Sequence, residues 1–252
     1  MSEDQATKVF YEVHDDIPRG GPGGSESTGK AFRMLTQLPK QPTILDIGCG
    51  PGMQTLDLAS LTEGKIIALD NHRPFLERLQ RAVEQRNLGS RISVVNGDMF
   101  VLDFGPGTFD LIWAEGSAYI MGFEKALRAW KNFLKKHGYI AVTEVAWLKT
   151  APPEELRSFW AKEYPSIQDA EANLNALRRS GYDPVGHFTL PESDWWDHYY
   201  TPIEAKLEAL QKKYKDSPDA LKILETEKRE IDIYRRYSDY YGYVFYIGQA
   251  QG

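Results

Sequence analysis

The chain has 252 residues, and its 42% hydrophobic and 26% charged residues are typical of a globular protein with a core large enough for one α/β domain. The net charge of −6 disfavours a nucleic-acid partner, because phosphate neutralisation requires a local excess of Lys and Arg. A single cysteine, Cys49, leaves no partner for a disulfide, and no apolar run suits a signal peptide or a membrane span, so we expect a cytoplasmic protein.

Residues 1–30 are expected to form an N-terminal arm that precedes the core of the domain. Gly and Pro crowd into residues 18–24, a composition that predicts a loop with unusual backbone angles. Ser27 or Thr28 is expected to cap a helix that stops near Pro39.

Residues 31–150 alternate short apolar runs with helix-length amphipathic segments. The expected strands are 43–47, 65–69, 92–95, 109–113 and 139–145, and the expected helices are 53–61, 74–87 and 123–136. This alternation predicts parallel strands joined by right-handed crossovers. The strands are apolar on both faces, which predicts helices on both sides of the sheet.

Residues 151–252 break this rhythm. The expected elements are helices at 152–160 and 167–180, a strand-like segment at 187–200, two charged helices within 203–240 and a buried strand at 243–247. We interpret this half as sheet completion plus a helical insertion. The charged faces of the two helices are expected to be solvated, with a lid or a homodimer contact as the functional alternative.

The strand at 44–47 runs directly into a glycine loop. Gly48, Gly50 and Gly52 allow a sharp turn and let a ligand approach backbone N–H groups without interference from a Cβ. Glycine turns also occur without ligands, so the loop alone does not identify a binding site.

Two acids further along the chain make this signal more specific. Asp70 ends the second strand, where a carboxylate can accept hydrogen bonds from ribose hydroxyls. Asp98 follows the third strand and can accept a hydrogen bond from an exocyclic amine, while Met99 can pack on a purine ring. Doubly wound sheets bind ligands at the carboxyl ends of their strands, so we expect these elements to converge on one crevice.

The segment Asp46-Ile-Gly48-Cys49-Gly50-Pro-Gly52 resembles the glycine motif of class I S-adenosylmethionine-dependent methyltransferases. Asp70 resembles their ribose-binding acid, and Asp98-Met99 resembles their adenine-contacting pair. This resemblance covers residues 40–147. Less distinctive segments at 18–27, 113–119 and 190–202 resemble the small-molecule branch that includes ubiquinone/menaquinone-biosynthesis-type methyltransferases.

The resemblance implies a Rossmann-like, doubly wound α/β fold with a seven-stranded, mostly parallel sheet and an antiparallel last strand. One methyltransferase domain would span residues 1–252, with an arm at 1–30, a cofactor-binding core at 31–150 and a substrate-shaping part at 151–252. The implied cofactor is S-adenosyl-L-methionine, converted to S-adenosyl-L-homocysteine. The expected function is methyl transfer to a small, apolar or aromatic acceptor.

The resemblance and the strand-end positions together predict the cofactor site. Its expected residues are Asp46, Gly48, Cys49, Gly50, Gly52, Asp70, Asn71, Asp98, Met99, Glu115 and Arg19. We expect residues 9–24 to fold over the cofactor and Arg19 to face its carboxylate. Glu115, just past the fourth strand, is expected to act electrostatically or by positioning, with general base as the second choice. His198 is the other candidate catalytic base.

Aromatic residues scattered through the chain are candidates for the acceptor pocket. The expected substrate residues are Tyr11, His14, Trp113, Tyr119, Trp147 and Tyr200. Aromatic faces also favour a sulfonium cation, although ordinary core packing is the alternative for most of these side chains. We expect no metal site, because the cluster at 194–198 has no second group of His or carboxylate ligands nearby in sequence.

Three other functions are weighed against small-molecule methyl transfer. A dinucleotide fingerprint G-x-G-x-x-G requires Gly or Ala where Met53 stands, which disfavours an NAD(P)-dependent oxidoreductase. A nucleic-acid methyltransferase is disfavoured by the charge and by Trp113-Ala-Glu-Gly, which stands where an Asn/Asp-Pro-Pro-Tyr/Phe motif is expected. A non-catalytic S-adenosylmethionine-binding protein stays open as an alternative.

Overall fold

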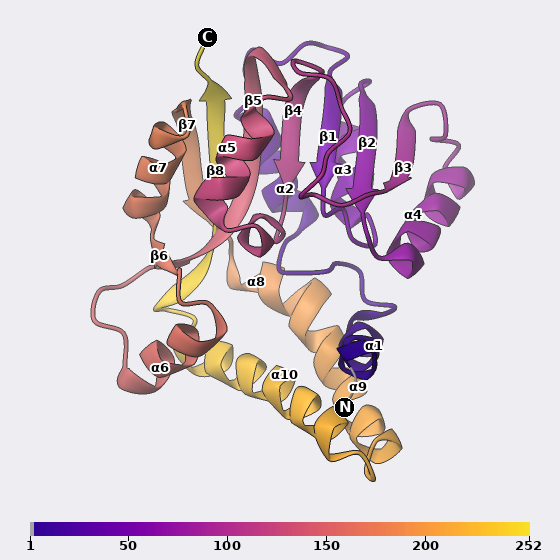
Figure 1. Cartoon of the computed structure of the whole chain (residues 1–252), viewed down its shortest axis with the longest axis vertical. Helices are drawn as coiled ribbons and strands as arrows, with labels where there is room; N and C mark the ends of the chain where they lie inside the picture. The colour runs from indigo at the N-terminus through magenta and orange to yellow at the C-terminus, as the bar shows by residue number, and fades with distance from the viewer. Residues whose placement is uncertain (1–2) are drawn as a thin grey trace.

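One mixed sheet organises the computed structural model, which describes residues 3–252 (Figure 1). Its strands are β1 (Thr43–Ile47), β2 (Lys65–Asp70), β3 (Ile92–Asn96), β4 (Phe109–Ala114), β5 (Leu134–Trp147), β6 (Gln168–Asp169), β7 (Tyr182–Thr189) and β8 (Tyr241–Ala250). Their order is β3-β2-β1-β4-β5-β8-β7, with β6 paired to β5 beside this path. β1 to β5 are parallel, and β8 runs antiparallel between β5 and β7. The expected mostly parallel sheet with an antiparallel last strand is confirmed.

Helices cover both faces of this sheet (Figure 1). They are α1 (Glu3–His14), α2 (Ser25–Arg33), α3 (Met53–Leu61), α4 (Arg73–Gln85), α5 (Phe123–Lys131), α6 (Glu154–Glu163), α7 (Ala170–Arg179), α8 (Glu192–Trp195), α9 (Thr201–Lys213) and α10 (Pro218–Tyr237), with the short segments η1 (Ala118–Ile120) and η2 (Trp196–Tyr200). One buried cluster joins α2, α3 and α4 to the sheet, and another joins α5 and α7 to its opposite face. Because both faces are covered, β4 is buried along its whole length.

A further layer of helices lies beyond the carboxyl ends of the parallel strands (Figure 1). α1, α6, α9 and α10 share a third buried cluster with side chains from the ends of β5 and β8. Within it the ring of Trp195 stacks on Tyr234 of α10 and on Tyr243 of β8, with centroids 4.2 and 5.2 Å away. The layer therefore faces the edge of the sheet where the glycine loop and the acids after the strands are found.

The expected strand at 187–200 is wrong in its second half. β7 ends at Thr189, and Glu192–Tyr200 is helical, as α8 and η2. In this helical segment Trp195 packs on Tyr234 of α10. Packing against the helical layer therefore overrides the strand propensity of an aromatic-rich segment.

Two helix boundaries also differ from the expectation. α5 ends at Lys131, short of the expected boundary, because β5 starts at Leu134 and pairs with β4 from that residue. Gly24 occupies the N-cap of α2, so Ser27 and Thr28 lie inside the helix and do not cap it. The side chain of Thr28 has another partner, described below.

Glu144 is a buried acid near the carboxyl end of β5. It is 2% exposed, and neither carboxyl oxygen has a hydrogen-bond partner among the described residues. Burial raises the pKa of Glu144 to about 8, and the Tyr164 hydroxyl close by offsets part of the shift. The folded protein therefore holds a proton here that the unfolded chain releases near pH 4.5.

We expect Glu144→Gln to flatten the pH dependence of stability. Because its folded pKa is raised, the stability linked to Glu144 is complete below pH 4.5 and is lost as the pH rises through about 8. Between pH 6 and 9 the free energy of unfolding of the wild type should fall by about 3 kcal/mol more than that of the variant, measured by urea unfolding. The exposed Glu26→Gln is the control and should keep the wild-type slope. An unchanged slope for Glu144→Gln would contradict the assignment.

Candidate active site

The glycine loop after β1 adopts backbone angles that favour glycine. φ is +69° at Gly48, +53° at Gly50 and +89° at Gly52. A Cβ at Gly52 would lie 2.3 Å from Cδ1 of Leu79 in α4, and a Cβ at Gly48 would lie 2.5 Å from Cβ of Ser117. A side chain at either position would therefore displace α4 or the segment that follows β4.

Asp70 holds this loop from the end of β2. Its carboxylate accepts hydrogen bonds from the backbone N–H groups of Gly50 at 2.9 Å and His72 at 2.8 Å. The carbonyl of Leu69 accepts another from the N–H of Gly48 at 2.8 Å. A carboxylate offers about four lone-pair sites, so Asp70 keeps acceptor capacity for a ligand in the adjoining cavity.

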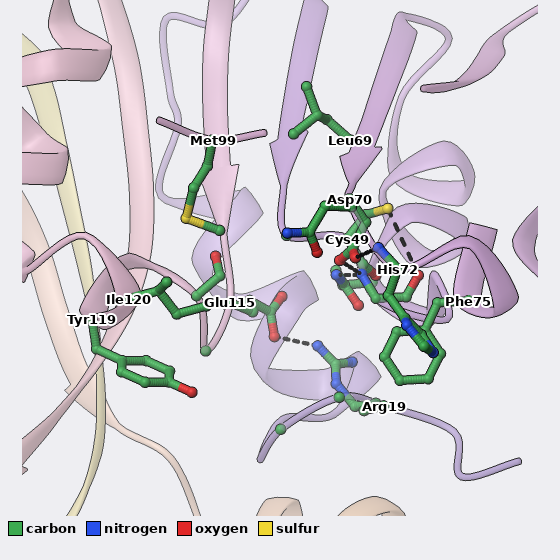
Figure 2. Close-up of a pocket in the computed structure, with 18 of the residues that line it drawn as sticks. Arg19, Cys49, Leu69, Asp70, His72, Phe75, Met99, Glu115, Tyr119 and Ile120 are labelled. Carbon is green, nitrogen blue, oxygen red and sulfur yellow. Dashed lines mark hydrogen bonds and ion pairs between the residues drawn. The ribbon is translucent and has the colours of Figure 1, made fainter. Parts of the chain in front are cut away.

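A cavity of about 180 Å³, the first cavity, opens beside the loop (Figure 2). Of the residues expected at the site, its lining contains Tyr11, Arg19, Gly48, Cys49, Gly50, Asp70, Asn71, Asp98, Met99, Glu115 and Tyr119. Most of the expected cofactor residues are thus brought together. Sequence reasoning missed His72 and Phe75, which begin α4 and also line the cavity. The His72 ring stacks on Tyr11 of α1 with centroids 3.5 Å apart, so α1 and α4 meet at its wall.

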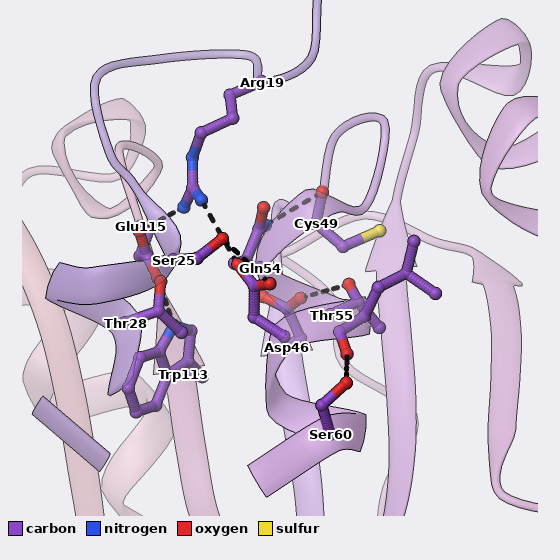
Figure 3. A network of polar contacts seen from close by, with 12 residues as sticks. Arg19, Ser25, Thr28, Asp46, Cys49, Gln54, Thr55, Ser60, Trp113 and Glu115 are labelled. Atoms are coloured by element: carbon purple, nitrogen blue, oxygen red, sulfur yellow. Dashed lines mark hydrogen bonds and ion pairs between the residues drawn. The ribbon is translucent and has the colours of Figure 1, made fainter. Parts of the chain in front are cut away.

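A buried polar network, the clamp, ties the N-terminal arm to the end of β4 (Figure 3). Arg19 forms an ion pair with one oxygen of Glu115, and the two side chains are 2% and 3% exposed. The other oxygen of Glu115 accepts hydrogen bonds from the Thr28 hydroxyl and the Trp113 indole N–H, both at 2.8 Å. Both carboxylate oxygens are therefore engaged, which favours the positioning role for Glu115 over the role of general base.

Arg19 contributes only part of its guanidinium to the clamp. Its Nη1 atom is buried, has no hydrogen-bond partner among the described residues and lies 3.9 Å from Oδ2 of Asp57. Arg19 also lines the first cavity. One N–H-bearing nitrogen is therefore left for an anionic group, although Glu115 already offsets most of the positive charge.

Two residues expected to contact the cofactor lie beneath the loop, outside the first cavity. Asp46 is fully buried at the end of β1, and its carboxylate accepts a hydrogen bond from the Thr55 hydroxyl at 2.6 Å. Burial raises the pKa of Asp46 to about 7. Gly52 serves as the N-cap of α3. Both residues support the loop from behind and do not line the cavity.

Four aromatic or His residues expected at the substrate site pack elsewhere. Trp113 is fully buried against Phe245, and Trp147 packs against the third buried cluster. The Tyr200 hydroxyl donates to Glu230 at 2.9 Å from within that cluster. His14 is buried between the Phe10 carbonyl and the Tyr199 hydroxyl, and burial lowers its pKa. Core packing therefore accounts for these side chains.

His198 was the second candidate base. It is half-buried on η2 and belongs to the lining of neither cavity described here. Its charge acts on Asp57 and Asp194, which flank the arm near Arg19. The geometry therefore does not place His198 at a reacting atom.

A second cavity, of about 220 Å³, adjoins the first and shares part of its wall. The shared residues are Phe10, Gly20, Gly21, Pro22, Gly116 and Tyr119. The rest of the lining is Val145, Trp160, Glu163, Tyr164, Trp195, Tyr199, Glu227, Glu230 and Tyr243. Of the expected substrate residues, Tyr119 lines this cavity. The two glutamates on α10 are spaced three residues apart, which puts them on one helix face, but this spacing is equally common on solvated helices.

The described residues contain no group of three or more His, Cys, Asp or Glu side chains arranged to hold a metal ion. Among residues 3–252, no helix combines the length and the apolar character needed to cross a membrane.

Comparison with known proteins matches residues 44–138 to the family model described as a methyltransferase domain. The sterol 24-C-methyltransferase of Kluyveromyces lactis is 27% identical over 225 residues, covering 79% of this chain and 60% of that protein. The Candida albicans enzyme of the same name is 24% identical over 233 residues, covering 82% and 61%. The chain thus spans about 60% of the length of these curated relatives.

Solved structures share the whole fold. A S-adenosylmethionine-dependent methyltransferase from Geobacter sulfurreducens, in complex with S-adenosyl-L-homocysteine, aligns with a TM-score of 0.81 at 18% identity, covering 97% of this chain and 98% of that one. YjhP from E. coli aligns with a TM-score of 0.84 at 17% identity, covering 97% and 100%. The predicted fold and the resemblance of the chain to class I methyltransferases are confirmed.

We expect Glu115→Gln to destabilise the protein by about 3–5 kcal/mol, because it removes the close counter-charge of the buried Arg19 guanidinium and leaves only Asp57, 3.9 Å away. Urea unfolding measures the loss, and trypsin cleavage after Arg19 should become faster as the arm detaches. The double variant Arg19→Gln/Glu115→Gln should recover part of the stability, because no charge stays buried. If Glu115→Gln alone kept wild-type stability, the clamp would contribute nothing to folding.

Proposed function

Because residues 44–138 match the family model described as a methyltransferase domain, we propose that the chain transfers the methyl group of S-adenosyl-L-methionine to a small molecule with an apolar or aromatic body. The observation that carries this proposal is the pair of adjoining cavities. The first contains the glycine loop and the acids after β2 and β3, and the second is walled by aromatic rings. A cofactor in the first and an acceptor in the second would meet at their shared wall.

The residues of the first cavity fit the proposed cofactor by the chemistry of their donors and acceptors. Asp70 offers lone pairs to ribose hydroxyls, while Asp98 and Met99 offer an acceptor and an apolar surface to adenine. The unpartnered Nη1 of Arg19 offers a donor to a carboxylate. When bound, this cofactor supplies a methyl group on a positively charged sulfur.

The chain itself contributes positioning and the exclusion of water. The clamp holds the arm segment Gly20–Pro22 against both cavities, so the acceptor and the cofactor are confined together. Holding two reactants in a reactive geometry lowers such a barrier by about 7–11 kcal/mol. We assign no general base to Glu115, because the clamp occupies both its oxygens.

The same cavities support a small-molecule partner over a nucleic acid. The second cavity is about 220 Å³, too small for a duplex, and no Lys or Arg lines it. The name of the sterol 24-C-methyltransferase relatives supports a compact, largely apolar acceptor. We further propose a cytoplasmic location, with which the free, buried thiol of Cys49 is compatible. α9 and α10 are the surfaces on which we would seek a homodimer contact.

We expect Asp70→Asn to weaken binding of S-adenosyl-L-homocysteine by about 1–3 kcal/mol, because the charged acceptor of the ribose hydroxyls is lost and one oxygen that accepts from the loop becomes an amide nitrogen. Isothermal titration calorimetry measures the change. The matched control is Asp103→Asn, at an exposed position outside both cavities, which should bind as the wild type does. Equal affinities for wild type and Asp70→Asn would overturn the ribose contact, and a wild type that binds no S-adenosyl-L-homocysteine would overturn the proposed function.

A further inference from the structure

We propose that the second cavity takes an acceptor that arrives as a cationic amine, and that the amine nitrogen is the atom methylated. This inference rests on the proposed function and names the substrate class of that site. Three observations support it: two carboxylates of α10 line the second cavity, they have no positively charged partner among the described residues, and aromatic rings surround them.

The charge of the lining has one sign. Glu227 and Glu230 project from one face of α10, and Glu163 of α6 lies at the margin, while the lining contains no Lys, Arg or His. Glu163 forms an ion pair with the exposed Lys162, and its proximity adds to the rise in the pKa of Glu230. The two glutamates of α10 are the acids left facing the cavity.

These two carboxylates have no cationic partner in the described structure. Among the described residues, the basic group within ion-pair distance of Glu227 is His14, whose Nε2 lies 4.0 Å from Oε2. Burial lowers the pKa of His14, so the ring is neutral at physiological pH and supplies no charge. Glu230 accepts one hydrogen bond, from the Tyr200 hydroxyl at 2.9 Å. Lys206, on the neighbouring α9, is occupied by the carbonyls of residues 12, 13 and 15.

Partly buried carboxylates without a partner are costly, and a bound cation removes that cost. Burial, together with the proximity of Glu230, raises the pKa of Glu227 to about 8, and burial raises the pKa of Glu230. An ammonium ligand would restore both groups to their charged forms. A neutral ligand of the same shape would leave the cost in place.

The aromatic walls suit the same ligand. Tyr119, Tyr164 and Tyr243 line the cavity, and Tyr119 meets Tyr164 edge to face with ring centroids 6.0 Å apart. Ring faces attract a cation and also accommodate an apolar body. Trp195, which lines the cavity, is 3% exposed, and its indole N–H has no partner among the described residues, a buried donor that a polar ligand atom would satisfy.

The chemistry balances without any further reactant. The ammonium first gives a proton to a glutamate of α10, which leaves a neutral amine with a free lone pair. The nitrogen then attacks the methyl carbon, a nitrogen–carbon bond forms, and the pair of the carbon–sulfur bond returns to sulfur. The positive charge passes from sulfur to the methylated nitrogen, and the glutamate releases its proton to water. A carboxylate held beside the amine can serve as the general base for this proton transfer.

The test is a calorimetric titration of the full chain loaded with S-adenosyl-L-homocysteine. The probes are 2-phenylethylamine, tryptamine and benzylmethylamine, each compared with the neutral compound in which a hydroxyl replaces the amine. We expect at least one amine to bind about tenfold more tightly than its neutral counterpart. Glu227→Gln/Glu230→Gln should reduce that preference to about threefold or less.

The matched control is Glu225→Gln, which removes an exposed acid from the same helix and should keep the wild-type preference. Binding of S-adenosyl-L-homocysteine, measured first, shows that each variant is folded. The inference is wrong if no amine is preferred by the loaded wild type, or if the double variant keeps the full preference. Turnover of S-adenosyl-L-methionine with a neutral acceptor alone would also reject it while leaving the proposed function intact.

Discussion

The buried ion pair between Arg19 and Glu115 is the interaction on which the site depends. It joins a loop from the N-terminal arm to the end of a central strand, with both side chains almost fully removed from water. Thr28 and Trp113 complete the hydrogen bonding of Glu115. The carboxylate therefore contacts the N-terminal arm, helix α2 and strand β4 at once. A charge pair buried in this way tolerates no partial opening, because one exposed partner leaves the other buried and unpaired.

The position of this pair decides how the two cavities are related. The segment Gly20–Pro22 follows Arg19 directly and contributes to the walls of both cavities, as does Gly116, which follows Glu115. The loop that lines the first cavity is therefore the same loop that borders the second. In this arrangement, one electrostatic contact sets the boundary across which the proposed transfer takes place.

The sequence predicted the parts of the site that local geometry determines. Gly48 and Gly52 sit at left-handed backbone angles with no room for a Cβ, and Asp70 follows a strand end, so a short pattern identifies them. The second cavity has no such pattern, because its walls come from α6, η2, α10 and β8, which only the fold brings together. Trp113 and Tyr200 illustrate the limit: an aromatic residue in the sequence gives no sign of whether its ring faces a cavity or the core.

The insertion of β8 between β5 and β7 has a consequence for how the molecule is made. β5 and β7 are synthesised first, yet neither pairs with the other, and each waits for a strand that follows the whole α9–α10 segment. On the ribosome, the nascent sheet therefore exposes open edges until residues 241–250 have emerged. The sheet therefore closes late, and helix α10, which carries Glu227 and Glu230, packs in place at the same stage. The second cavity is thus among the last features to form.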